Sequence, residues 1–277
     1  MRVVVTGAGG TVARAFLEQA PSHHDVVPLA HADLDVGDHH AVMGTVVLLH
    51  PDAIVNLAAM TRVDDCEIER EEAYRSNTAG PHNLALAARA SGAVLLHVST
   101  DYAFDGTKDA PYDELDRPNP ISVYARSKVG GEELVRAHLP EHFVVRTGWI
   151  FGGGPDHLSR TVERMRAGEP GAGLSDRVGT PTFVRHLAER LLPLILTGRF
   201  GTYHLSGPET ASWFDVLTRI RFLAGLPVEV ERQLAQDLAL PAARPANSAL
   251  TSLFAGDLGL AMPPLDVALK EFLDGHD

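Results

Sequence analysis

Short apolar runs alternate with longer amphipathic segments along the first half of the chain. The apolar runs predict strands at residues 2–6, 26–29, 52–57, 93–98 and 142–147. The amphipathic segments predict helices at residues 12–19, 39–50, 73–90 (interrupted near Asn77) and 124–137. Nearly continuous apolar strands joined by helices are typical of a parallel sheet covered on both faces. We therefore predict an α/β fold built on a doubly wound parallel Rossmann-type sheet.

The pattern becomes less regular after Ile150. Residues 151–155 contain three consecutive glycines and are interpreted as a hinge. Beyond them we expect helices at 183–196, with Thr182 as N-cap, at 212–224, opened by a Ser212–Asp215 capping box, and at 265–273, together with a strand at 201–205. We predict a dinucleotide-binding domain over residues 1–148 and a smaller C-terminal α/β substrate lobe over 149–277, with segments exchanged between the two.

A glycine-rich turn separates the first strand from the first helix. Read as G-x-x-G-x-x-G, it contains Gly7, Gly10 and Ala13. Gly7 would turn the chain, Gly10 would let a pyrophosphate approach the backbone N–H groups, and the small Ala13 would allow close helix packing. Thr11 and Val12 would contribute further contacts. The alternative is an ordinary βα turn of a flavodoxin-like fold, but the place of the turn in a parallel-sheet pattern favours a dinucleotide.

The type of dinucleotide depends on the end of the second strand. Ala30-His31 supplies neither a carboxylate for the adenosine ribose nor an arginine for a 2′-phosphate. We favour NADPH on this basis and keep NADH as an alternative. Further cofactor contacts are expected after the second and third strands, at Asp35, Val36, Ala58, Ala59 and Thr61. The same residues would also suit buried strand ends without a ligand.

Groups suited to proton transfer lie between Ser99 and Lys128. Tyr124 and Lys128 are four residues apart, so a helix places both on one face. The Lys128 ammonium would favour the phenolate and lower the pKa of Tyr124. Thr100, at the end of the fourth strand, could hydrogen-bond the same oxygen that Tyr124 protonates. This set fits the reduction of a ketone, although the Tyr–Lys spacing alone is common on helix surfaces.

Composition excludes several classes of function. The net charge is −12, from 24 Lys and Arg and 36 Asp and Glu, which argues against binding to nucleic acid or an anionic membrane. Cys66 is the single cysteine, so an internal disulfide and a thiolate zinc site are excluded. The 14 histidines lack ligand spacing, and we predict no metal site. The initial strand and the lack of a membrane-length apolar run predict a cytoplasmic protein.

Together, Gly7-x-x-Gly10-x-x-Ala13 and Tyr124-x-x-x-Lys128 resemble an extended short-chain dehydrogenase/reductase. A finer resemblance, to the dTDP-4-dehydrorhamnose reductase family, covers almost the entire chain and rests on residues 55–64, 99–106, 146–150, 179–182 and 244–248. It implies that Tyr124 is the proton donor, that Lys128 holds the nicotinamide ribose, and that Thr100 polarises the C4 ketone. It also implies sugar contacts from Asp101, Tyr102 and Trp149.

The resemblance further implies a nicotinamide in the N-terminal cleft and a dTDP-4-keto-6-deoxyhexose beneath the C-terminal lobe. The expected product is dTDP-rhamnose, with another deoxysugar of secondary metabolism as an alternative. A second alternative is a non-catalytic nucleotide-binding subunit, similar to the regulatory subunit of methionine adenosyltransferase. The intact set of Thr100, Tyr124 and Lys128 favours an enzyme. The sequence leaves the C4 stereochemistry, the use of magnesium and a possible homodimer open.

Overall fold

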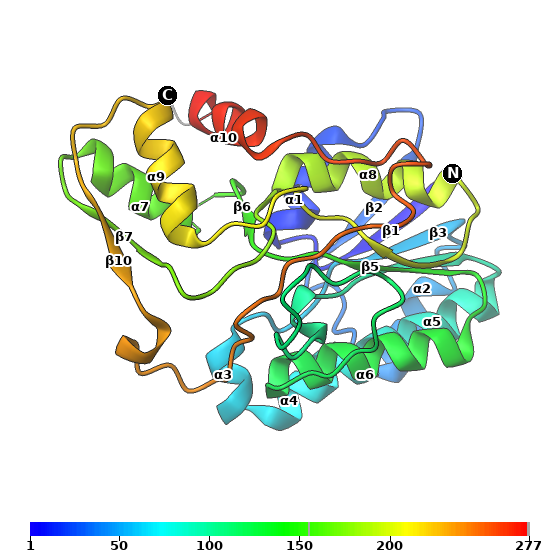
Figure 1. The fold of residues 1–277 in the computed structure, drawn as a ribbon. Helices are drawn as coiled ribbons and strands as arrows, with labels where there is room; N and C mark the ends of the chain where they lie inside the picture. Colours follow the sequence, from blue (N-terminus) through cyan, green and yellow to red (C-terminus); the bar gives the residue numbers. More distant parts are fainter. Residues whose placement is uncertain (155, 276–277) are drawn as a thin grey trace.

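A six-stranded parallel sheet forms the centre of the computed structural model, which describes residues 1–154 and 156–275 (Figure 1). Its strands, in spatial order, are β2 (Asp25–Leu29), β1 (Arg2–Thr6), β3 (Ala53–Asn56), β4 (Val94–Val98), β5 (His142–Arg146) and β9 (Gly201–His204). Every neighbouring pair is parallel. The predicted Rossmann-type sheet is therefore confirmed.

Helices cover both faces of this sheet (Figure 1). One face carries α1 (Thr11–Gln19) and α8 (Val184–Leu196), and the other carries α2 (His39–Val46), α5 (Gly80–Ser91) and α6 (Val123–His138). Successive side chains of a strand point to opposite faces. In β5, for example, Val145 belongs to the core beneath α8 and Val144 to the core beneath α5. Burial on both sides explains why the strands are almost wholly apolar.

A smaller unit lies beside the sheet, at the left of Figure 1. It contains α7 (His157–Arg166), α9 (Trp213–Leu223), α10 (Leu265–Asp274) and the parallel pair β7 (Gly171–Leu174) and β10 (Val230–Gln233). These elements share a separate apolar core that includes Val162, Leu217 and Phe272. Because α8 and β9 follow residue 148 yet pack with the main sheet, the chain passes between the two units more than once. A domain boundary at residue 148 stays a prediction.

Local details differ from the expectations at several helix ends. Thr182 is not the N-cap of α8, because it pairs in the short strand β8 (Thr182–Phe183) and its hydroxyl accepts from Gly207 N at 3.1 Å. The Ser212–Asp215 capping box of α9 is present as expected. The predicted hinge begins with Phe151 in β6 (Ile150–Phe151), and its last residue, Pro155, lies outside the described residues.

The predicted interruption near Asn77 is a π-helical turn, η1 (Arg75–Ala79), between α4 (Arg70–Tyr74) and α5. Asn77 is fully buried, and its side-chain oxygen accepts from Met60 N at 2.8 Å. Its amide nitrogen donates to Met60 O and to Ser127 Oγ, each at 3.0 Å. Asn77 thus joins the loop after β3 to α6, the helix that carries Tyr124 and Lys128. Single π turns are frequent at functional sites.

Candidate active site

A cavity of about 510 Å³ lies at the carboxyl ends of the central strands, facing the smaller unit. Its volume is within the range of small-molecule sites, and its position is where open parallel sheets bind ligands. Eleven of the predicted site residues line it: Gly10, Thr11, Val12, Ala59, Thr61, Thr100, Asp101, Tyr102, Tyr124, Lys128 and Trp149. Four others lie outside its lining, namely Gly7, Asp35, Val36 and Ala58.

The glycine turn has the geometry that a pyrophosphate site needs. Gly7 has φ +71°, and a Cβ there would lie 2.6 Å from Ala58 N, so the position requires glycine. Gly10 is the N-cap of α1; within the described chain no side chain caps this helix and no acidic residue occupies its first turn. Its N-terminal N–H groups and helix dipole therefore suit an anionic ligand, and the residues present fit a dinucleotide.

Two of the predicted cofactor contacts, Asp35 and Val36, lie apart from this cavity. Asp35 accepts a hydrogen bond from Arg75 Nη1 at 2.6 Å and another from Gly37 N at 2.9 Å. Burial would raise the pKa of Asp35, but these hydrogen bonds lower it. Val36 is buried in the core, where Gly80 leaves room for it. A cofactor contact from either residue stays a prediction.

Tyr124, Lys128 and Thr100 are brought together as expected. Ser122 caps α6 by accepting from Ala125 N, which fixes the start of the helix just before Tyr124. Lys128 Nζ donates to Val98 O at 2.7 Å and so reaches the end of β4. Thr100 Oγ1 accepts from Tyr102 N at 3.1 Å, and its hydroxyl also interacts with the Tyr124 phenol. The three side chains line one wall of the cavity.

Their pKa values are governed by burial. Burial raises the pKa of Tyr124 to about 12, although the interaction with Thr100 opposes the rise. Burial lowers the pKa of Lys128 to about 8, and the negative charge of Glu132 opposes that change. The expected lowering of the Tyr124 pKa by Lys128 is thus not seen, because desolvation of the phenol dominates and the ammonium is directed at Val98 O. Tyr124 therefore stays protonated at neutral pH, as a proton donor must.

Asp101 presents an unsatisfied carboxyl to the cavity. It is 4% exposed, Thr100 Oγ1 donates to one oxygen at 3.3 Å, and the other oxygen has no hydrogen bond of ordinary geometry among the described residues, although the Ser248 hydroxyl is near enough to lower the pKa of Asp101. Burial raises the pKa of Asp101 to about 7. Thr147, which lines the same cavity, also has a buried hydroxyl without a partner in the described chain. Unsatisfied buried polar atoms at a cavity are suited to a polar ligand. Thr147 was not predicted, although it lies within the 146–150 motif.

Tyr102 lies between the main sheet and the C-terminal segment. Its ring is edge-on to that of Tyr124, with centroids 6.2 Å apart. Its phenol interacts with Arg244, whose guanidinium forms two hydrogen bonds to Asp64 at 3.0 and 2.8 Å. Asp64 belongs to α3 (Val63–Ile68), a helix that the sequence pattern did not reveal. The Asp64–Arg244 pair fastens the C-terminal segment beside Tyr102.

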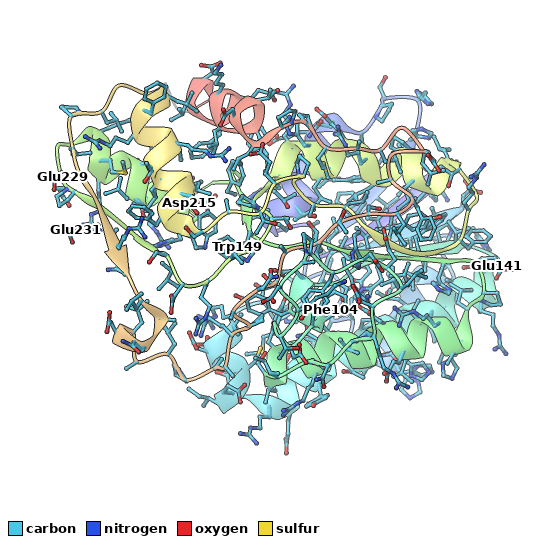
Figure 2. The ribbon with its side chains drawn as sticks, in the orientation of Figure 1. Phe104, Glu141, Trp149, Asp215, Glu229 and Glu231 are labelled. Carbon is cyan, nitrogen blue, oxygen red and sulfur yellow. The ribbon has the colours of Figure 1, made fainter. Side chains whose placement is uncertain are left out.

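Trp149 connects the sheet to the smaller unit, and Figure 2 shows it between them. It has φ +51°, which is unusual for a non-glycine residue, and its Nε1 donates to Ser248 Oγ at 3.0 Å. Its ring stacks on Trp213, with centroids 4.8 Å apart and an interplanar angle of 17°. Trp213 also lines the cavity. Trp213 was not predicted as a site residue, because only the packing of α9 against Trp149 brings it there.

Comparison with known proteins places this geometry in context. A family model described as RmlD substrate binding domain matches residues 1–276. A dTDP-4-dehydrorhamnose reductase of Mycolicibacterium smegmatis is 37% identical over 265 residues, covering 94% of this chain and 80% of that protein. The crystal structure of a dTDP-4-dehydrorhamnose reductase from Bacillus anthracis in complex with NADP is 33% identical, with a TM-score of 0.95 and 99% of both chains covered. Its counterpart from Clostridium acetobutylicum is 34% identical, with a TM-score of 0.94 and the same coverage.

Proposed function

This chain belongs to the RmlD substrate binding domain family, and we propose that Thr100, Tyr124 and Lys128 carry out the reaction for which its relatives are named. The activity is that of a nicotinamide-dependent 4-ketoreductase of a dTDP-4-keto-6-deoxyhexose, a dTDP-4-dehydrorhamnose reductase. The observation that carries the assignment to these residues is their meeting on one wall of the cavity, beside the glycine turn.

The glycine turn and α6 hold the cofactor in this proposal. The N–H groups at the start of α1, from Gly10 onward, bind the pyrophosphate, and Lys128 holds the nicotinamide ribose. When bound, the reduced nicotinamide supplies a hydride to the keto carbon of the sugar. NADPH is favoured because the solved relative from Bacillus anthracis binds NADP, and NADH stays an alternative.

Proton transfer falls to Tyr124. Its phenol is protonated at neutral pH and lies beside the Thr100 hydroxyl, so both can donate a hydrogen bond to the same ketone oxygen. Negative charge develops on that oxygen during reduction, and preorganised donors stabilise such charge most effectively. Tyr124 then releases its proton to the alkoxide. The Thr100 hydroxyl, which opposes the rise of the Tyr124 pKa, stabilises the phenolate that is left.

The dTDP-sugar occupies the part of the cavity nearer the smaller unit. Asp101, Tyr102 and Trp149, which all line the cavity, contact the sugar. Two buried polar atoms support this placement, because neither has a hydrogen bond of ordinary geometry in the described part of the chain. They are one Asp101 carboxyl oxygen and the Thr147 hydroxyl. We also propose a cytoplasmic location. A homodimer stays a prediction.

To test this function, the protein is incubated with dTDP-4-keto-6-deoxyglucose and NADPH, with and without a 3,5-epimerase. NADPH oxidation is followed by absorbance and the sugar product is identified by NMR. Formation of dTDP-rhamnose only in the presence of the epimerase supports the assignment. Equal turnover without the epimerase points to another deoxysugar, and the absence of oxidation in both reactions contradicts the ketoreductase assignment.

None of the helices in the described ranges is long and apolar enough to cross a membrane. In the same ranges, no group of three or more His, Cys, Asp or Glu residues is arranged to hold a metal ion.

A further inference from the structure

Glu132 is a fully buried carboxylate behind the cavity wall formed by Thr100, Tyr124 and Lys128. The reaction described above does not use it. It is 0% exposed and accepts hydrogen bonds from three other side chains. Arg146 donates to both of its oxygens, at 3.0 and 2.7 Å, and Arg136 donates at 2.7 Å. Ser99 Oγ donates at 2.5 Å. Such a buried charge is expensive unless it is fully paired, as it is here.

Glu132 continues the row of catalytic residues along α6. Tyr124, Lys128 and Glu132 are spaced four residues apart, so they follow one another on the same helix face. The row meets the chain at the end of β4, because Lys128 Nζ donates to Val98 O, in the last residue of the strand, and Glu132 accepts from the hydroxyl of the next residue, Ser99. The next residue along the chain is Thr100. Glu132 therefore fixes the strand end from which the Thr100 hydroxyl projects.

Among the described titratable groups around Lys128, Glu132 is the one that carries a full negative charge at neutral pH. On its own helix Lys128 is flanked by the neutral Tyr124 and by Glu132. From β4, burial lowers the pKa of His97 well below its usual value, so this imidazole is uncharged at pH 7. From the short 3-10 helix η2 (Asp101–Ala103) after β4, Asp101 has a pKa that burial raises to about 7, so its negative charge is reduced at neutral pH.

The ionisation of Glu132 is secured by two arginines, Arg146 on β5 and Arg136 one turn along α6. Burial would raise the pKa of Glu132, but these arginines and the Ser99 hydroxyl lower it to about 2. The Arg146 guanidinium is held in turn over the ring of Phe104, 5.2 Å from its centroid, in the middle of the molecule (Figure 2). Arg136 is anchored to β9 through Thr202 Oγ1 at 3.1 Å. The carboxylate is therefore fixed in both charge and position.

We propose that Glu132 is a positioning residue for the reduction, because its carboxylate anchors the Thr100 strand end through Ser99 and balances the buried charge of Lys128. The effect of Glu132 on catalysis rests on the proposed function. The electrostatic part concerns only residues of this chain and can be measured without turnover.

The chain offers a direct measurement, since it contains only three lysines, Lys108, Lys128 and Lys270. With lysine labelled at ¹³Cε and ¹⁵Nζ, each side chain gives one resolvable NMR titration, and Lys128→Met assigns the signal of Lys128. The Glu132 charge opposes the fall of the Lys128 pKa; side chains four residues apart on a helix are neighbours, and an opposite charge within about 4–6 Å changes a pKa by about one unit or more. Glu132→Gln should therefore move the Lys128 titration midpoint down by about one pH unit, while Lys108 and Lys270 stay unchanged.

Arg146→Met is the matched control, because it breaks the same buried ion pair but removes the opposite charge. It should leave the Lys128 midpoint unchanged or move it up. Should Glu132→Gln not fold, the double variant Glu132→Gln/Arg146→Met removes the pair without leaving Arg146 buried and unpaired. A smaller downward shift of the Lys128 midpoint is then expected, because the loss of the Arg146 charge offsets part of the loss of the Glu132 charge. A Lys128 midpoint within about 0.3 pH units of wild type in the folded Gln variant overturns the electrostatic role.

Catalysis supplies the second readout. The alkaline limb of the kcat/KM profile for NADPH oxidation should move down with the Lys128 midpoint in Glu132→Gln. In Ser99→Ala, which loses the anchor of the strand end but no charge, kcat should fall about tenfold without a change in that limb. If kcat fell equally in all variants and the alkaline limb of the kcat/KM profile did not move, Glu132 would have a purely structural role. Wild-type protein without turnover would contradict the proposed function and leave the NMR result valid.

Discussion

The Asp101 carboxyl occupies the space directly above Gly148, where a Cβ would collide with Asp101 Cγ. The two residues follow adjacent strands, β4 and β5, and Asp101 N donates to the carbonyl of Thr147, the residue before Gly148, at 2.9 Å. The carboxyl is thereby held at the cavity, next to Thr100. The motif around Trp149 thus includes a glycine whose function is to admit an acid from the neighbouring strand.

Gly148→Ala should displace the Asp101 carboxyl and distort the Thr100 turn. Inserting a methyl group into a packed site costs about 1–3 kcal/mol. We expect a matching loss of unfolding free energy in urea, and a larger proportional loss of kcat/KM. Gly44→Ala is a suitable control, because a Cβ at Gly44 meets no neighbouring atom within 4 Å. Wild-type kinetics in the Gly148 variant would show that the position of Asp101 is unimportant.

The raised pKa of Asp101 predicts a specific pH dependence of stability. The folded protein holds this proton up to about pH 7, whereas the unfolded chain releases it near the ordinary value of 3.8. The folded state therefore binds more protons between these values, so the contribution of Asp101 to stability falls as pH rises from about 4 to 7, by about 1.4 kcal/mol per pH unit at most. Urea unfolding at several pH values should show a flatter dependence in Asp101→Asn.

Asp105→Asn is the control for that measurement, since its pKa is perturbed in the opposite direction. Hydrogen bonds from Thr107 and Asn119 lower the pKa of Asp105 to about 2. Its stabilising effect is present above about pH 4 and is lost as pH falls toward 2. Asp105→Asn should therefore reduce stability chiefly above pH 4. The same pH dependence in both variants would contradict the assigned environment of Asp101.

Tyr124→Phe should abolish NADPH oxidation, because it removes the proton donor and leaves the ring in place. Loss of a general acid typically costs about 10²- to 10⁴-fold in rate. Cofactor affinity, measured by NADPH fluorescence, should stay near the wild-type value, since Lys128 and the glycine turn are intact. Tyr112→Phe serves as the control, because Tyr112 is a buried phenol outside the cavity lining. Full activity in Tyr124→Phe would refute the catalytic assignment.

Both tryptophans of the chain, Trp149 and Trp213, belong to the stack that borders the cavity. Tryptophan fluorescence, excited selectively over the five tyrosines, therefore reports on this site. We expect a saturable change in emission on titration with dTDP, and a change of smaller amplitude in Trp213→Phe. Trp213→Phe should also raise the KM for the nucleotide sugar more than it lowers kcat, because it alters a wall and not the reacting groups. A titration without an emission change would place the nucleotide elsewhere.

Local pattern was sufficient for the main sheet and for much of the catalytic wall. The strands are apolar because both of their faces are buried, and the glycine turn follows the first strand at a fixed place in such folds. The spacing of Tyr124 and Lys128 is a property of one helix, so it could be read without knowing the fold. The Ser212–Asp215 capping box is equally local, and it was predicted and found.

What the sequence determined by itself was therefore the layered sheet, its first glycine turn and the residues that one helix or one strand end carries to the site. Only the tertiary structure decided that Trp213 stacks on Trp149, that Gly148 makes room for Asp101, and that Arg244 pairs with Asp64, 180 residues away along the chain. The structure likewise revealed that Glu132 lies behind Lys128 as the acceptor for Arg146 and Ser99. These contacts join segments that no local periodicity relates, and their energies depend on burial, which exists only once the two units have packed together.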